Sequence, residues 1–363
     1  MVYLPESKVH SAGLILADKP KAVSSRTLVS QLASILGIKR AGHIGTLDPM
    51  ATGLVGVLLG RATLLASYLM GLSKRYRAEI LLGTLTDTDD ITGQLIEREP
   101  PDRSYPSRKD VVEALEGLIG ESLQIPPCYS AISVNGIRSY KRARAGHSFS
   151  LPARKVFLFE ATILAYCPPE LSLDLKVSSG YYIRSLARDL PKALGLCGGT
   201  LSNLRRLEIG PFKVEDSVAF PFARQEILDK IIPPKAALSE LAELVLDQEE
   251  LSRFLNGAFL SQIEAKRIIA PIGSKGHLNS YPQGPIKILD GMGDLRALGK
   301  FAFSQSLPNK IIKNRNDHLP IESIKNRNEQ KIIEANEIFS HNNNEMDTLL
   351  TSQRPYLRPL RII

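Results

Sequence analysis

The chain has 363 residues, of which 43% are hydrophobic and 23% are charged. This composition supports a folded core in about two domains and excludes a wholly disordered, collagen-like or coiled-coil protein. The formal net charge of +8 favours polyanionic partners. The three cysteines, Cys128, Cys167 and Cys197, have no Cys-x-x-Cys spacing, so they indicate a reducing cytoplasm rather than a disulfide framework or a zinc site.

No segment predicts a signal peptide or a membrane anchor. Residues 1–11 lack a basic region followed by an apolar run. Residues 50–72 are apolar enough to resemble a membrane span, but Arg61 lies at their middle and glycines interrupt them. We therefore expect this stretch to be buried core and the protein to act without a membrane.

The chain begins with a predicted strand and helix. Residues 13–16 are typical of a short buried strand, which residues 18–20 (Asp-Lys-Pro) end. Apolar residues then recur at helical spacing. Ser24 or Ser25 is the expected N-terminal cap, and Gly37 stands where a left-handed C-terminal cap belongs.

The following elements mix strands and helices irregularly. Residues 76–82 and 171–177 alternate as strands. Residues 107–119 predict a second capped helix that ends at Gly120, and a helical stripe covers residues 183–190. Because there is no regular βαβ rhythm, the pattern favours an α+β fold with a mixed sheet and flanking helices.

The chain changes character towards its C-terminus. We assign residues 1–243 to a first domain. Short apolar runs broken by glycines predict a small β-rich domain over residues 244–304, to which residues 354–363 return as a last strand. Residues 305–353 are rich in asparagine and contain no glycine, so we interpret them as a polar, mobile insertion.

The most unusual segment of the sequence is residues 43–53, in which Asp48 lies between glycines and precedes Pro49. Proline biases Asp48 away from helical geometry, as a functional loop would require. An Asp-Pro pair is also a common start of a helix, with the aspartate as its N-cap. The residues alone favour the cap.

Basic residues form small clusters that are separated in sequence, with Tyr76 and Tyr140 beside two of them. Positive charge mixed with stacking surface is typical of RNA binding, and a solvated surface is the plainer alternative. The clusters are Lys39-Arg40, Lys74-Arg75 with Arg77, Lys141-Arg142 with Arg144, Arg154-Lys155, and Arg205-Arg206.

Three carboxylates, Asp87, Asp89 and Asp90, lie close enough in sequence to suggest a magnesium site, but a polar loop after a strand explains them better. There is no Gly-Lys-Ser/Thr phosphate loop and no Gly-x-Gly-x-x-Gly fingerprint. No His-Glu-x-x-His arrangement occurs either. The sequence therefore predicts neither a cofactor nor a resident metal.

Taken together, these segments resemble the TruB family of bacterial tRNA pseudouridine synthases, in the family's own order along the chain. The similar segments are Gly13 to Pro20, His43 to Gly53, Lys74 to Arg77, Thr86 to Gly93, Pro126 to Ala131 with Gly136, Tyr140 and Ala143-Arg144, then Gly180 to Arg184 and Leu204 to Arg206. The resemblance implies a pseudouridine-synthase catalytic domain with an RNA-gripping insertion at about residues 124–153. It also implies a PUA-like C-terminal domain.

The resemblance gives individual residues their roles. Asp48 matches the nucleophile, and Arg184 matches the partner that keeps its carboxylate ionised. Tyr76 is expected to stack on the target base near its reacting carbon. Tyr182 and Leu204 match the uracil pocket, and His43 matches a histidine that holds the flipped nucleotide. The candidates for RNA contact are Lys19, Arg40, Tyr140, Arg144, Arg205 and Arg206.

The expected reaction is the isomerisation of uridine 55 in the T loop of tRNA, with no cofactor, metal, membrane or obligate protein partner, by a monomer. The alternative is a tRNA-binding folding chaperone whose catalysis is incidental or lost. A metal nuclease at the three neighbouring aspartates is a third reading. The chain departs from the family at Leu64, Ser133 and Pro191, where we expect effects on RNA grip or local geometry.

Overall fold

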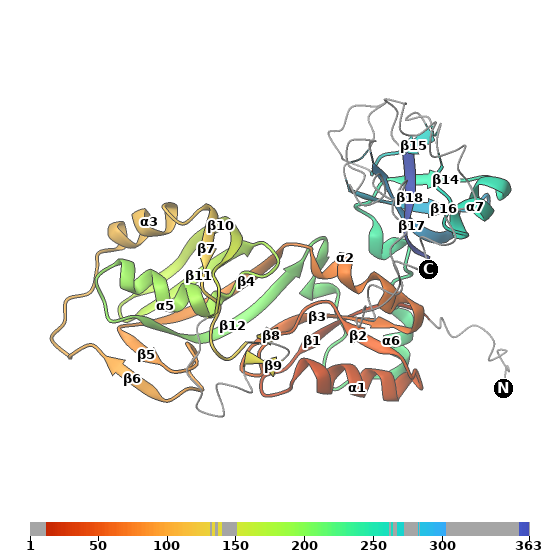
Figure 1. The fold of residues 1–363 in the computed structure, drawn as a ribbon. Helices are drawn as coiled ribbons and strands as arrows, with labels where there is room; N and C mark the ends of the chain where they lie inside the picture. The colour runs from red at the N-terminus through yellow and green to blue at the C-terminus, as the bar shows by residue number, and fades with distance from the viewer. Residues whose placement is uncertain are drawn as a thin grey trace, which may run out of the picture. The chain divides into compact units, whose positions relative to one another are not determined.

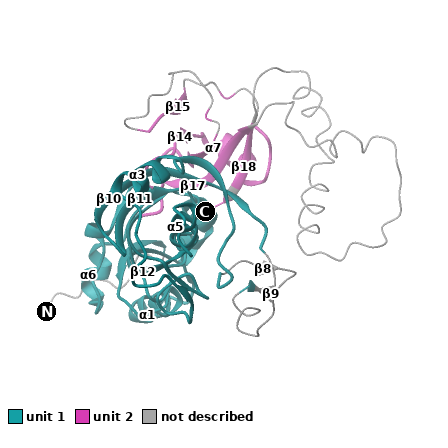
Figure 2. Cartoon of the chain, turned by 90° about the vertical axis from the view of Figure 1, so that its left-hand side faces the viewer, with its two compact units in different colours: residues 1–232 teal, residues 233–363 magenta. Residues whose placement is uncertain are grey.

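A computed structural model describes residues 12–130, 133–134, 137–139, 151–260, 263, 267–271, 282, 284–302 and 356–362. The chain divides into two compact units, residues 1–232 and 233–363 (Figure 2). The boundary between the units follows residue 232, whereas the sequence analysis ended the first domain at residue 243. Of the segments singled out above, residues 305–353 lie outside the described part, as do residues 131–132, 135–136 and 140–150 of the expected RNA-gripping insertion.

Unit 1 is built on a nine-stranded sheet with the strand path β1-β3-β12-β4-β11-β10-β7 (Figure 1). Strand β2 pairs with β3, and β13 pairs with β12. Adjacent strands on this path are antiparallel, except that β3 and β12 are parallel. The strands are β1 (Gly13–Lys19), β2 (Ala41–His43), β3 (Thr52–Leu59), β4 (Lys74–Leu82), β7 (Gly120–Gln124), β10 (Arg154–Cys167), β11 (Glu170–Val177), β12 (Gly199–Ile209) and β13 (Phe212–Lys213).

Three helices of unit 1, α1, α3 and α5, pack on this sheet, and two small hairpins stand outside it (Figure 1). The helices of unit 1 are α1 (Ser25–Leu36), α2 (Ala66–Met70), α3 (Arg108–Glu116), α5 (Ile183–Ala193) and α6 (Arg224–Asp229), with short 3₁₀ turns η1 (Gly60–Leu65) and η2 (Val214–Asp216). The hairpins are β5 (Thr84–Thr86) with β6 (Leu95–Arg98), and β8 (Ser133–Val134) with β9 (Ile137–Arg138).

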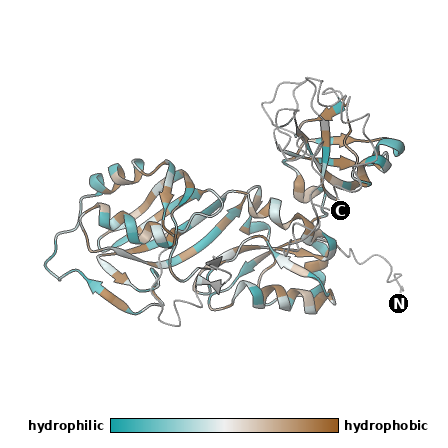
Figure 3. Cartoon of the chain, viewed as in Figure 1, coloured by the Kyte–Doolittle hydropathy of each residue, from teal (hydrophilic) through white to brown (hydrophobic). Residues whose placement is uncertain are grey.

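One apolar core joins the sheet to its helices. Helix α1 contributes Leu28, Leu32 and Leu36 at helical spacing, and α5 contributes Ile183 and Leu186. Apolar and polar side chains alternate along β11 and β4, so that each strand has one buried side (Figure 3). The α+β prediction is confirmed, because helices cover a mixed sheet without a βαβ repeat.

The caps predicted for α1 are confirmed, whereas the end predicted for α3 is wrong. The Ser24 hydroxyl accepts from the Thr27 amide, and Gly37 adopts the left-handed conformation with φ 70°. Helix α3 has its cap at Ser107 but ends at Glu116 rather than at residue 119. A glycine at 117 weakens the helix there, and a tight turn leads directly into β7.

The apolar stretch at residues 50–72 is folded core, as expected. It forms β3, η1 and α2, and the side chains of Leu54, Val55 and Leu58 are fully buried. Arg61 is exposed. No helix in the part of the chain that the structure describes is long and apolar enough to cross a membrane.

Unit 2 is a five-stranded sheet with the order β15-β14-β16-β17-β18. Its core includes Phe254, Leu244, Ile288 and Leu357. The last strand, β18, pairs with β17 and completes the sheet. The elements are η3 (Ala236–Leu238), β14 (Glu243–Val245), α7 (Gln248–Leu255), β15 (Ile268–Ile269), β16 (Pro285–Leu289), β17 (Leu295–Ala302) and β18 (Tyr356–Ile362).

The structure describes the surroundings of Leu64 and Pro191, two of the three residues that depart from the family pattern. Leu64 is half-buried in η1. Pro191 is buried in the last turn of α5, where its ring lies against Gly199 at the start of β12. Ser133 lies in β8. The proline therefore affects how α5 packs on the sheet, away from the ion pair at the other end of that helix.

Candidate active site

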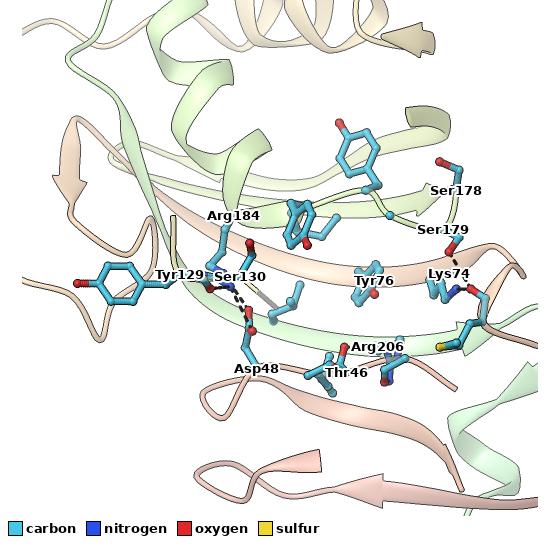
Figure 4. A pocket seen from close by; sticks show the side chains of 18 residues that line it. Thr46, Asp48, Lys74, Tyr76, Tyr129, Ser130, Ser178, Ser179, Arg184 and Arg206 are labelled. Carbon is cyan, nitrogen blue, oxygen red and sulfur yellow. Dashed lines mark hydrogen bonds and ion pairs between the residues drawn. The ribbon is translucent and has the colours of Figure 1, made fainter. Parts of the chain in front are cut away.

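A cavity of about 370 Å³ opens in unit 1 between the loop before β3, the strands β4 and β12, and the start of α5 (Figure 4). Asp48 and Arg184 point at each other at one end, and Lys74 and Ser179 lie towards the other end. The lining residues are Gly45, Thr46, Leu47, Asp48, Met70, Lys74, Tyr76, Tyr129, Ser130, Ser178, Ser179, Gly180, Tyr181, Tyr182, Ile183, Arg184, Leu204 and Arg206.

Asp48 lies on a loop between β2 and β3 that is anchored to α1. The Leu47 amide donates to the Ser25 hydroxyl at 2.9 Å, and the same hydroxyl donates to the Leu47 carbonyl at 3.0 Å. A tight turn follows Asp48, closed by the Ala51 amide, and leads directly into β3. The helix-cap alternative for Asp48 is therefore wrong: no helix begins here, and the carboxylate is free to face the cavity.

Arg184 lies in the first turn of α5 and holds the Asp48 carboxylate with a two-pronged contact. Its Nε is 2.9 Å from one carboxylate oxygen, and its Nη2 donates to the other at 3.3 Å. The remaining guanidinium donors bond the carbonyls of Thr88 and Tyr129, both at 3.0 Å. The Arg184 side chain is 6% exposed and that of Asp48 is 32% exposed, so the anion is the member of the pair that substrate can reach.

Aromatic and apolar side chains form the walls beside this pair. Tyr76 projects from β4 and is 9% exposed, and Leu204 projects from β12. Tyr182 immediately precedes α5. Burial raises the pKa of Tyr182, and raises that of Tyr181 to about 12, so both phenols are neutral at physiological pH. The structure brings these predicted residues together with Asp48 and Arg184.

His43 lies on β2 and is not among the residues that line the cavity. Its Nδ1 accepts a hydrogen bond from the Gly45 amide at 3.3 Å. Burial and the nearby Arg206 lower the pKa of His43, which favours the neutral imidazole. Its predicted contact with the nucleotide remains a prediction.

The basic residues expected to contact RNA differ in exposure. Arg40 is exposed, and Arg205 forms a partly exposed pair with Asp18 at 2.7 and 3.0 Å. Lys19 is fully buried and donates to three carbonyls, those of Pro20, Val23 and Pro49. Arg206 is 1% exposed. Tyr140 and Arg144 lie outside the described residues.

For Lys19 and Arg206 we correct the expectation of RNA contact, because their charged groups are committed to backbone carbonyls inside the fold. Charge clusters in a sequence do not reveal which side of a strand is buried. Lys74 was not among the residues predicted for the site, yet it lines the cavity and its side chain donates to the carbonyls of Met70 and Leu72 at 2.5 and 2.6 Å. The one feature of the sequence that could have indicated a role for Lys74 is its membership of the basic cluster Lys74-Arg75 with Arg77.

The neighbouring aspartates stabilise their own loop. The Asp90 carboxylate accepts hydrogen bonds from Thr88 and Thr92, and Asp89 pairs with Arg188 at 3.1 Å. The polar-loop interpretation fits these contacts. Among the residues that the structure describes, no group of three or more His, Cys, Asp or Glu side chains is placed to hold a metal ion.

The chain is similar in sequence to proteins of a known family. A family model described as "TruB family pseudouridylate synthase (N terminal domain)" matches residues 33–183. The chain is 40% identical over 252 residues to "tRNA pseudouridine synthase B" of Xanthomonas axonopodis pv. citri (strain 306), covering 68% of this chain and 80% of that protein. It is 37% identical over 295 residues to the protein of the same name in Syntrophobacter fumaroxidans, covering 79% and 92%.

Solved structures agree on the fold. The chain matches one titled "Crystal Structure of a Cbf5-Nop10-Gar1 Complex" with a TM-score of 0.60 and 22% identity, over 87% of this chain and 84% of that chain. At this identity the likeness supports the architecture alone. The two curated relatives and the family model carry the assignment, and they confirm the resemblance seen in the sequence. The chain belongs to the TruB family of pseudouridylate synthases and is an isomerase.

Proposed function

We propose that this protein converts uridine 55 in the T loop of tRNA to pseudouridine, with Asp48 as the nucleophile. The observation that carries the proposal is the pairing of Asp48 with Arg184 at a cavity that Tyr76 also lines. The substrate class is supported by the curated relatives, which are named tRNA pseudouridine synthases. A net charge of +8 suits a polyanionic substrate.

The reaction exchanges the C1′–N1 glycosidic bond of uridine for a C1′–C5 bond, so no atom or electron is gained or lost overall. The Asp48 carboxylate either attacks the sugar covalently or removes a sugar proton, and both routes need it ionised. The Arg184 guanidinium pairs with this carboxylate through both of its oxygens and so orients it. Asp48 is the one carboxylate among the described residues that line the cavity.

The walls have a separate task, which is to keep the detached uracil while it turns. Tyr76 offers a ring face for stacking, and Leu204 and Tyr182 provide apolar surface. The target uridine is stacked in the T loop and must be flipped into the cavity, at a cost of a few kcal/mol. Contacts between exposed basic residues, such as Arg40, and RNA phosphates offset this cost.

The test is pseudouridine mapping on an unmodified tRNA transcript incubated with purified protein, in parallel with Asp48→Ala. We expect pseudouridine at position 55 with the wild-type protein alone, and equal tRNA binding by both proteins. A transcript with cytidine at position 55 is the matched substrate control. Activity in the Asp48→Ala variant would overturn the nucleophile assignment.

Two further outcomes would support the alternatives. Tight tRNA binding by the wild-type protein without any pseudouridine would favour the tRNA-folding chaperone. Magnesium-dependent cleavage of the transcript, abolished by EDTA, would favour the nuclease reading of Asp87, Asp89 and Asp90.

A further inference from the structure

The side chain of Arg206 reaches from β12 beneath the loop that carries Asp48. Its Nε donates to the Leu54 carbonyl at 2.6 Å, and its Nη2 donates to the Gly45 carbonyl at 3.0 Å. Its Nη1 lies 3.5 Å from the Thr46 carbonyl. These three acceptors come from the two chain segments that lie immediately before and after Asp48.

The environment of this guanidinium is unusual for a charged group. Arg206 is 1% exposed and is among the largest fully buried side chains in the described part of the chain. Within that part, its charge is balanced by carbonyl dipoles and not by a carboxylate ion pair. Burying an ionised group is costly unless its donors are satisfied, so the three carbonyls must stay in place for the fold to tolerate it.

The backbone of Arg206 is as closely fitted to this loop as its side chain. Arg206 lies opposite Gly53 in the parallel pairing of β12 with β3. A Cβ at Gly53 would lie 2.3 Å from the Arg206 carbonyl oxygen, and Gly53 has φ 102°, so only glycine fits there without strain. The Asp48 loop is thus anchored by Ser25 on one side and by Arg206 on the other.

We propose that Arg206 is a positioning residue, whose planar guanidinium fixes the backbone around Asp48 so that the carboxylate meets Arg184 and the cavity. The inference rests on the proposed function, in which Asp48 is the nucleophile. It replaces direct RNA contact as the role of Arg206. A lysine would keep the charge, but its single ammonium cannot span carbonyls on both sides of Asp48 with fixed geometry.

The charge of Arg206 gives a readout that does not depend on activity. It adds to burial in lowering the pKa of His43. The imidazole Nδ1 also accepts a hydrogen bond from the Gly45 amide, on the loop that Arg206 holds. Removing the charge should raise the pKa of His43, whereas replacing arginine by lysine should largely preserve it.

The experiment compares the full-length wild-type protein with Arg206→Lys, Arg206→Met and Asp48→Ala. It measures the rate of pseudouridine formation at saturating tRNA, the Kd for tRNA, and the pKa of His43 by NMR, assigned with a His43→Gln variant. We expect both Arg206 variants to lose about 100-fold in rate, the size of effect that a misplaced reacting group produces. The Kd should stay within about threefold, and the pKa of His43 should rise in Arg206→Met alone.

Arg103→Met is the matched control, because Arg103 also donates to a carbonyl, that of Gly195, but lies outside the cavity lining. It should leave the rate unchanged. A normal rate in Arg206→Lys and Arg206→Met, or a weakened Kd with a normal rate at saturation, would overturn the positioning role. If Arg206→Met does not fold, the rate and the Kd of Arg206→Lys alone test the positioning role. Activity in Asp48→Ala would instead show that the proposed function itself is wrong.

Discussion

Arg184 makes more contacts than an ion pair requires. Two of its nitrogens contact the Asp48 carboxylate, one of them by a hydrogen bond, and it also donates to the carbonyls of Thr88 and Tyr129. Lysine at this position would retain a positive charge but could not make a forked contact with the carboxylate and two carbonyls together. The guanidinium therefore sets the orientation of the carboxylate.

We expect Arg184→Lys to lower the rate of isomerisation at saturating tRNA by about 100-fold, because the carboxylate loses its orientation. The Kd for tRNA should change by less than about threefold, since the buried guanidinium is not a surface contact. Single-turnover kinetics and filter binding measure the two effects. An unchanged rate would count against the pair.

Lys74 makes a second residue-scale prediction, on stability against pH. Burial, with a smaller effect of Arg206, lowers its pKa from 10.5 to about 8. Between these two values the unfolded chain binds the proton more tightly than the folded one, so this residue makes the protein more stable as pH rises from about 8 to 10. Below pH 8 both states are charged and the penalty is fully present.

Urea unfolding of wild type and Lys74→Met at pH 8 and at pH 10 tests this. The free energy of unfolding of wild type should rise relative to the variant by at most about 1.4 kcal/mol per pH unit. A Lys176→Met variant, whose side chain is partly exposed on β11, is the control and should show no such change. A constant difference between wild type and Lys74→Met would contradict the prediction.

Among the elements, α5 owes its starting point to a residue outside it. Tyr182 is its N-terminal flanking residue and makes no side-chain capping bond. The buried Gln124 side chain, at the end of β7, accepts from the Tyr182 amide at 2.8 Å and donates to its carbonyl at 3.0 Å. Gln124 thereby places both the Tyr182 ring and the Arg184 guanidinium two residues later.

We expect Gln124→Met to lower the isomerisation rate by roughly tenfold and to destabilise the fold by about 1–3 kcal/mol, because buried backbone groups lose their partner. Gln124→Glu keeps one acceptor and should have the smaller effect on rate. Gln94→Met, at an exposed position, is the control. Kinetics with a tRNA transcript and urea unfolding measure these effects, and a wild-type rate in Gln124→Met would refute the positioning argument.

The ends of a helix can be predicted from the sequence where capping residues determine them. Ser24 and Gly37 delimit α1 because cap preferences depend on a few neighbouring atoms. The Asp48-Pro49 pair has the same local signature as a helix start, yet a turn into β3 follows it. The contacts that decide this come from Ser25 and Arg206, which are distant in sequence.

At the scale of the molecule, each unit has an apolar core of its own. The core of unit 1 is formed by the large sheet with α1, α3 and α5, and that of unit 2 by the small sheet with Phe254. The residues that line the cavity all belong to unit 1. We therefore expect unit 1 to fold by itself and to catalyse the isomerisation without unit 2.

A truncated chain of residues 1–232 should unfold cooperatively and form pseudouridine at a similar maximal rate. Its affinity for tRNA should be lower, because basic residues of unit 2 are missing. Thermal unfolding followed by circular dichroism, together with kcat and KM on the transcript, checks this. A folded truncated protein with no activity at saturating tRNA would show that unit 2 takes part in the chemistry.

The sequence by itself determined the α+β class, the main helices and strands, and the family resemblance that pointed to Asp48, Tyr76 and Arg184. Each depends on local patterns: alternation, caps and short motifs. Tertiary structure alone decided the geometry of the Asp48–Arg184 pair, whose members lie 136 positions apart, and decided that Arg206 is buried while its neighbour Arg205 is partly exposed. The physical reason is that strand pairing selects which face of β12 is covered, and a one-residue difference places a side chain on the opposite face.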